Sequence, residues 1–128
     1  MIKFLNGNYE VTTKRDHYPN RINVEDLAKI ILVCIQNHVP KRIINATDQK
    51  NITTYDAINY VTDELGLTKP IPVDYQKASI SDMAREFFSS SKTVRSKIIN
   101  EKLDYNYIYP DFKKALLYLT KVSLEDQK

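Results

Sequence analysis

The feature that most constrains this 128-residue chain is its glycine content, which is limited to Gly7 and Gly66. A loop that cradles phosphate needs several closely spaced glycines, because backbone amides must approach the anion with no Cβ in the way. Two glycines so far apart can form neither a dinucleotide-binding fingerprint nor a P-loop. We therefore expect no cofactor-binding site within the chain itself.

The composition is that of an ordinary soluble domain, with 42% hydrophobic and 27% charged residues. The net charge of +3 singles out neither nucleic acid nor a membrane surface as a partner. No apolar run approaches the roughly 20 residues that a membrane-spanning helix needs, no signal peptide is visible, and Cys34 has no partner for a disulfide. We expect a cytoplasmic protein with one domain over residues 1–122 and a polar tail over residues 123–128.

Hydrophobic periodicity predicts short strands that alternate with helices. Strands are expected over residues 9–13, 42–46 and 105–109, and helices over residues 25–36, 53–65, 94–103 and from 112 onward, with a turn or two of helix over 82–88. Residues 68–74 hold two prolines and are expected to be extended or looped. The order indicates an α/β (α+β-like) fragment with a small mixed sheet and four helices.

Capping residues and apolar spacing give the details of these helices. Asn23 is expected to cap the first helix, with Asp26 as its third-position acid, while Thr53 and Gly66 bracket the second and Asp111 caps the last. The residues expected to face inward are Leu27, Ile30, Ile31, Cys34 and Ile35 in the first helix, Tyr55, Ile58, Val61, Thr62 and Leu65 in the second, and Phe112, Ala115, Leu116 and Leu119 in the last.

Four segments, in order, resemble extended short-chain dehydrogenases of the NAD-dependent epimerase/dehydratase family. Residues 20–28 (NRINVEDLA) look like its I-H-V-x-D-L-A run, with Asn23 in place of the histidine, and residues 43–48 (IINATD) look like its next strand. Residues 53–67 are similar to the following helix, which ends in E-L-G-L. Residues 89–110 resemble its closing pattern, carried by Ser91, Lys92, Val94, Leu103, Tyr105, Tyr109 and Pro110.

The resemblance implies that the chain is the C-terminal, substrate-side part of an extended Rossmann-type dehydrogenase, without the nucleotide-binding half. In that family NAD(P) and the catalytic Tyr-x-x-x-Lys belong to the preceding half, so we expect no activity from this chain alone. A homodimer or a companion Rossmann chain is then the expected partner. The alternatives are a dimerisation or protein-docking module and, below these, a nucleic-acid-binding domain, against which the scattered and partly offset positive charge argues.

The family implies two arginines that hold a substrate diphosphate, and Pro19 and Ser79 stand at their places. The polar residues nearby are therefore the candidate substrate-binding residues: Tyr18, Asn20, Arg21 and Arg85. The alternative for both arginines is a solvated surface position. This departure leaves open whether a nucleotide sugar is the substrate.

Two other patterns are not expected to carry chemistry. Residues 109–113 (YPDFK) spell Tyr-x-x-x-Lys, but Pro110 is expected to place Tyr109 before the helix begins, away from the face that Lys113 occupies. His17 and His38 have no neighbouring ligand pattern and are expected to be exposed loop residues. We accordingly predict no catalytic residue and no metal site.

Overall fold

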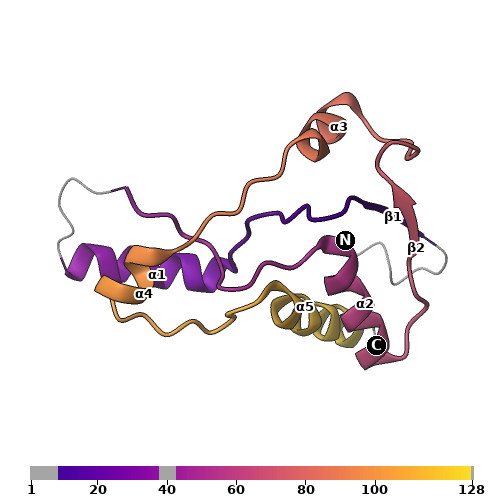
Figure 1. The fold of residues 1–128 in the computed structure, drawn as a ribbon. Coiled ribbons are helices and arrows are strands. Elements are labelled where there is room, and N and C mark those ends of the chain that lie inside the picture. The colour runs from indigo at the N-terminus through magenta and orange to yellow at the C-terminus, as the bar shows by residue number, and fades with distance from the viewer. Residues whose placement is uncertain (1–8, 38–42, 128) are drawn as a thin grey trace.

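The computed structural model describes residues 9–37 and 43–127, which form a mixed α/β structure (Figure 1). Its elements are β1 (Glu10–Thr13), α1 (Val24–Gln36), α2 (Thr54–Leu65), β2 (Ile71–Asp74), α3 (Asp82–Ser89), α4 (Lys97–Lys102) and α5 (Phe112–Asp126). The α/β class is as predicted. Within the described ranges, however, the sheet is parallel rather than mixed, and there are five helices rather than four.

The two strands pair in parallel, with Glu10 opposite Ile71 and Thr13 opposite Asp74. Residues 68–74 were expected to be extended or looped, and the extended alternative holds for Ile71–Asp74, which form β2. Pro72 is tolerated because both strands of a two-stranded sheet are edge strands, where a missing backbone N–H need not break a ladder. Because the two strands are parallel, their carboxyl ends lie side by side at the same end of the sheet.

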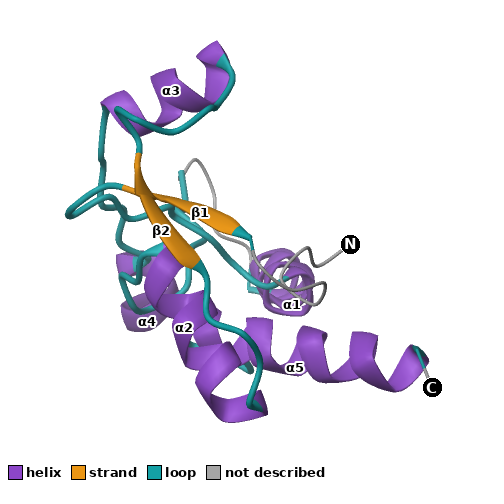
Figure 2. Cartoon of the chain, turned by 90° about the vertical axis from the view of Figure 1, so that its right-hand side faces the viewer, coloured by secondary structure: helices purple, strands orange, loops and turns teal. Residues whose placement is uncertain are grey.

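One end of the molecule is built around α2, which packs against β1 and α5 (Figure 2). Its core is Val11, Ile58 and Val61, and the partly buried residues packed on it include Tyr55, Leu65 and Leu116. The predicted inward face of α2 is thus confirmed. Thr53 caps the helix by accepting from the Asp56 N–H at 3.1 Å, and Gly66 ends it with a φ of 62°.

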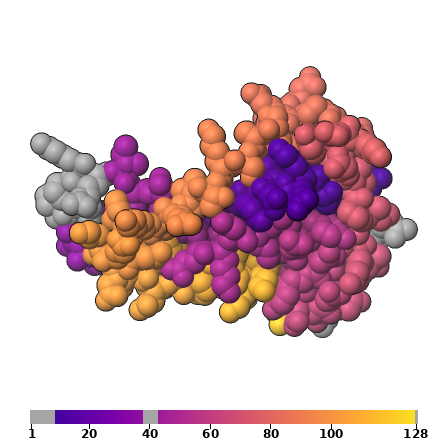
Figure 3. Space-filling view, in the orientation of Figure 1, coloured from indigo at the N-terminus to yellow at the C-terminus, as the bar shows by residue number. Residues whose placement is uncertain are grey.

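The other end holds α1 and α4, and it is narrower in the space-filling view (Figure 3). Its core consists of Ile30 of α1, which packs with Ile99 of α4 and with Leu103. Of the predicted inward stripe of α1, Ile30 is buried, Leu27 is 36% exposed, Ile31 53% and Ile35 73%. The spacing of that stripe was predicted correctly, but its burial was not.

Asp26 attaches α1 to the segment before α5. Its fully buried carboxylate accepts from the backbone N–H groups of Ile108 at 2.8 Å and Tyr109 at 2.9 Å, and from the hydroxyl of Tyr105 at 2.7 Å. Asn23 caps α1 as predicted, through the Glu25 N–H. The role of Asp26 as a capping-box acid was wrong, because three long-range donors use both of its oxygens.

Two further predictions about strands and helix starts need correction. Among the described residues, 43–46 form no strand, and Ile43 is 91% exposed. The helix expected from residue 94 begins only at Lys97, because the Ser96 hydroxyl bonds to Thr47 instead of capping a helix. The hydroxyl oxygens of Ser96 and Thr47 are buried in this contact. The contact holds the residues before Ser96 extended.

The last helix also differs in detail from the prediction. Asp111 caps α5 as expected, by accepting from the Lys114 N–H at 3.1 Å. Leu119 is 47% exposed rather than inward. The helix continues to Asp126, so most of the expected polar tail is helical.

Candidate functional site

Two of the four predicted substrate-binding residues, Tyr18 and Asn20, border one cavity of about 190 Å³ together with Phe87 and Lys92. The Asn20 amide is already engaged, because its Nδ2 donates to the Lys92 carbonyl at 2.6 Å and its Oδ1 accepts from the Val94 N–H at 2.9 Å. Among the described residues, the Tyr18 hydroxyl makes one long bond, of 3.3 Å to the Asp16 carboxylate, which leaves it available to a ligand.

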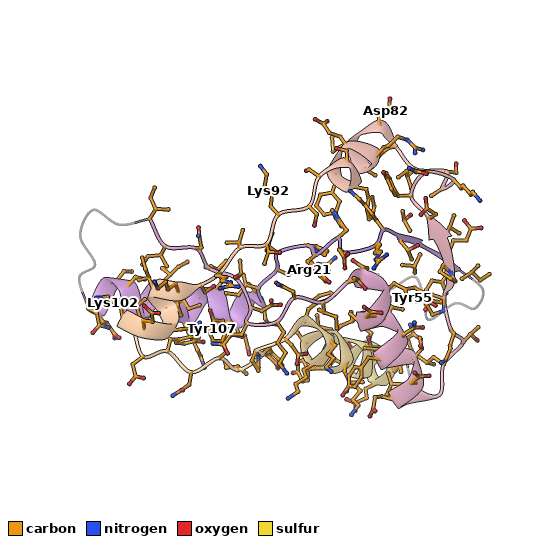
Figure 4. All side chains as sticks on the ribbon, in the orientation of Figure 1. Arg21, Tyr55, Asp82, Lys92, Lys102 and Tyr107 are labelled. Atoms are coloured by element: carbon orange, nitrogen blue, oxygen red, sulfur yellow. The ribbon has the colours of Figure 1, made fainter. Side chains whose placement is uncertain are left out.

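Arg21 lies between the two ends of the molecule, near the start of α2 (Figure 4). Its guanidinium carbon is 4.2 Å from the centre of the Phe112 ring, and Nη2 donates to the Thr54 hydroxyl at 2.9 Å. Burial lowers the pKa of Arg21, and its buried Nη1 has no hydrogen-bond partner among the described residues. Arg21 is therefore a partly buried arginine rather than a fully solvated surface residue.

Arg85 stands apart from the other three. Its guanidinium donates to the backbone carbonyls of Tyr75 at 2.9 Å and Ala78 at 3.1 Å. These bonds fasten the turn after β2 to α3, which gives Arg85 a positioning role in this loop. The structure thus brings Tyr18 and Asn20 to one cavity, places Arg21 at a different cavity and in contact with Thr54 of α2, and leaves Arg85 on α3.

His17 is the residue that the sequence prediction placed wrongly. Instead of facing solvent it is only 5% exposed, and its ring centre lies 4.8 Å from the centres of both Phe87 and Phe88. Burial and the nearby Lys14 ammonium lower the pKa of His17, and the Ser90 backbone partly offsets this. Because the contact joins segments 70 residues apart, no local sequence signal predicted it. His38 lies outside the described residues.

A second cavity, of about 200 Å³, lies on another side of His17. It is bordered by the carboxyl end of β1, including Lys14 and Arg15, and by the first turn of α2 from Thr53 to Asp56. In parallel α/β sheets, ligands bind beyond the carboxyl ends of the strands. Sequence reasoning missed this cavity because the strand that completes the edge, β2, was not predicted.

Two carboxylates, Asp48 and Asp111, border a third cavity of about 370 Å³ together with Arg21. Burial and the neighbouring Asp111 raise the pKa of Asp48 to about 6, although Arg21 opposes this. Asp111 is 1% exposed, and its Oδ2 lies 3.9 Å from the Lys50 ammonium. The backbone holds the cluster together, since the Asp48 N–H donates to the Arg21 carbonyl at 2.7 Å.

The exposed side of α1 forms an apolar surface with a shallow cavity of about 370 Å³. We name this surface the α1 face, and it consists of Leu27, Ile30, Ile31, Cys34, Ile35, Ile44 and Ala46. Residues 43–46 run along it without a strand partner among the described residues. Large contiguous apolar surfaces are typical of sites where proteins or domains contact one another.

Other chemistry has little support in the described residues. No group of three or more His, Cys, Asp or Glu side chains there could hold a metal ion. Tyr109 precedes α5, as predicted, and the Lys113 ammonium lies 4.8 Å from the centre of the Tyr60 ring rather than beside a catalytic hydroxyl. No helix in the same ranges is long and apolar enough to cross a membrane.

Among solved structures, the chain is similar to that of a longer protein described as a functionally unknown conserved protein from Silicibacter pomeroyi DSS. The two share 29% sequence identity and superpose with a TM-score of 0.79, over 91% of this chain and 46% of that one. The chain therefore spans about half the length of this neighbour. No protein-family model and no curated protein matches the chain.

Proposed function

We propose that this chain is the substrate-binding part of an NAD-dependent epimerase/dehydratase-like protein and requires a Rossmann half to act. The observation that carries the proposal is the α1 face, where an amphipathic helix leaves Ile31 and Ile35 more than half exposed. A monomeric domain gains nothing from such a stripe unless another surface covers it. More than half of the solved neighbour lies outside the match. This supports the idea that a further part of the protein packs on the α1 face.

The described residues do not fit a dinucleotide. Gly66 caps the carboxyl end of α2, whereas a pyrophosphate cradle needs glycines between a strand and the amino end of a helix. NAD(P) would accordingly be held by the Rossmann half, which supplies hydride-transfer chemistry when loaded. Tyr18, Asn20 and Arg21 are proposed to meet the substrate, and Arg85 to position the loop beside it.

The first test is calorimetry with NADH on the chain alone, for which we expect no saturable heat. Tight binding would overturn the proposal, because the cofactor would then have a site that needs no second half.

A parallel test uses the solved neighbour. We expect its helix that matches α1 to be covered by the unmatched part of that protein, and that part to hold a glycine-rich βαβ unit. A solvent-exposed helix there would contradict the proposal.

Homodimerisation is the second candidate function, because two copies could cover their α1 faces in a symmetric contact. Sedimentation should then show concentration-dependent association that Ile31→Asp abolishes. Met83→Asp is the matched control, since Met83 is a large apolar residue on α3 that is 82% exposed and lies off the α1 face. A monomer at all concentrations would exclude the homodimer and leave the companion chain as the partner.

A further inference from the structure

The cavity that Arg21, Asp48 and Asp111 border is also lined by residues from the amino ends of α1 and α5. Its volume of about 370 Å³ falls within the range of about 300–1,000 Å³ that is typical of small-molecule sites, so it can hold a whole small ligand. Most of its remaining walls are apolar or aromatic, and they include Ile22, Val24, Tyr109, Phe112 and Leu119. The cavity therefore combines an apolar lining with three charged groups.

Two of these charged groups have a buried atom without a hydrogen bond. The Asp111 side chain is buried and its Oδ1 caps α5, but its Oδ2 has no hydrogen-bond partner among the described residues. The largely exposed Lys50 ammonium attracts this oxygen from 3.9 Å, which is beyond hydrogen-bond distance. Nη1 of Arg21 likewise has no partner in the described ranges, although Nη2 donates to Thr54. One acceptor and one donor are thus left over at one cavity, and a bound group explains both.

The charges around this cavity balance one another, which favours a neutral ligand. Asp48 and Asp111 supply two negative charges when both are ionised, and Arg21 and Lys50 supply two positive charges. A charge on the ligand would have no counter-charge in a partly buried place, and this costs free energy. Burial and the neighbouring Asp111 already raise the pKa of Asp48, so the place tolerates unbalanced charge poorly.

An amide group meets these requirements. It carries an N–H donor and a carbonyl acceptor on neighbouring atoms and has no net charge. A carboxylate offers only acceptors and an ammonium group only donors, and each of them brings a charge. A hydroxyl group can donate and accept, but it must reach both protein groups from a single oxygen. The leftover donor and acceptor therefore match an amide better than these other groups.

We propose that this cavity binds a small neutral molecule with an apolar body and an amide group. The amide N–H donates to the Asp111 carboxylate, and the amide carbonyl accepts from the Arg21 guanidinium. The apolar body packs on Val24, Phe112 and Leu119, which line the same cavity. Only the identification of this molecule as the substrate rests on the proposed function. The amide site itself requires only this chain.

The first test is a titration of the chain with benzamide at about pH 8, where Asp48, with a pKa of about 6, is ionised. We expect saturable changes in the NMR signals of residues that border the cavity, with a Kd in the millimolar range that is usual for so small a ligand. Benzoate and benzylamine carry the same ring with a charge, and should bind at least about tenfold more weakly. Benzyl alcohol should also bind more weakly than benzamide. Equal binding of benzamide and any of these three would overturn the proposal.

The second test is Asp111→Asn. Asparagine caps helices as well as aspartate does, so α5 should be kept, but its NH₂ group replaces Oδ2 and cannot accept from the ligand. Benzamide binding should fall by about tenfold or more. The substitution also leaves an excess of positive charge, so benzoate should bind more tightly than it binds to the wild-type chain. Glu101→Gln is the matched control, because it neutralises an exposed carboxylate at another cavity, and it should change neither affinity.

Three results would overturn the amide site: no response to benzamide at tens of millimolar, changes spread over the whole surface, or equal effects of the two substitutions. If Asp111→Asn does not fold, the comparison of the four ligands on the wild-type chain still decides. None of these results bears on the NADH and sedimentation tests. The failure of the amide site is therefore distinguishable from the failure of the proposed function.

Discussion

The helices α2 and α1 are of similar length and both are amphipathic, yet they are buried very differently. On α2 the apolar side meets β1 and α5, and Val61 is fully buried. On α1 only Ile30 is buried among the apolar residues, and Ile35 is 73% exposed. The apolar side of α2 is thus buried against other elements, whereas most of the apolar side of α1 is exposed.

The difference indicates how each end is stabilised. The α2 end uses hydrophobic burial, which is proportional to the apolar area removed from water. The α1 end has a hydrophobic core of its own around Ile30 and Ile99, and it adds polar attachments, chiefly the buried carboxylate of Asp26 and the Thr47–Ser96 contact. Polar attachments fix the position of α1 while its apolar side remains free, which is what a docking surface requires.

The largest expected effect comes from removing the attachment at Asp26. Asp26→Ala leaves two backbone N–H groups and the Tyr105 hydroxyl without their acceptor, which should lower the free energy of unfolding by about 3 kcal/mol or more. Asp56→Ala, at an exposed acid in the first turn of α2, is the control, and should change it by about 0.5 kcal/mol or less. Urea unfolding measures both. Equal effects would mean that Asp26 is not the main attachment of α1.

The sequence predicted local features better than burial. The caps at Thr53 and Asp111 and the turn at Gly66 could be read because a cap depends on residues within one helical turn. The apolar spacing of α1 was also readable, but its exposure was not, because burial depends on which distant segments pack on the helix. The contacts of His17, with residues 70 positions away, have no local sequence signal.

A smaller effect should appear in hydrogen exchange between the two helices. Amides around Val61 in α2 should exchange at least about tenfold more slowly than those around Ile31 in α1, after correction for intrinsic rates, because local opening of α1 exposes little additional apolar surface. NMR-detected exchange on the chain alone measures this ratio. Equal protection would show that α1 needs no further partner for its stability, and would weaken the docking interpretation of the α1 face.

The smallest expected effect concerns Asp48, which lies between the two ends beside Arg21 and Asp111. Its pKa is raised from 3.8 to about 6, so the folded state keeps the proton while the unfolded chain loses it. Stability contributed by this group is therefore lost as the pH rises from about 4 to about 6. Above about pH 6 the Asp48 carboxylate is ionised in the folded state as well, and its burial then destabilises the folded state by the full amount.

Asp48→Asn removes the titration and should make the protein more stable than wild type above pH 6, by about 1 kcal/mol once the screening of a half-exposed group is allowed for. Urea unfolding at about pH 4 and about pH 8 should show the gap at the higher pH and little at the lower. Glu101→Gln is the control, because Glu101 is an exposed carboxylate that borders another cavity with Asp48. A variant that is less stable at the higher pH would mean that Asp48 joins the two ends as an ionised acceptor, and that the junction relies on charge as the attachment at Asp26 does.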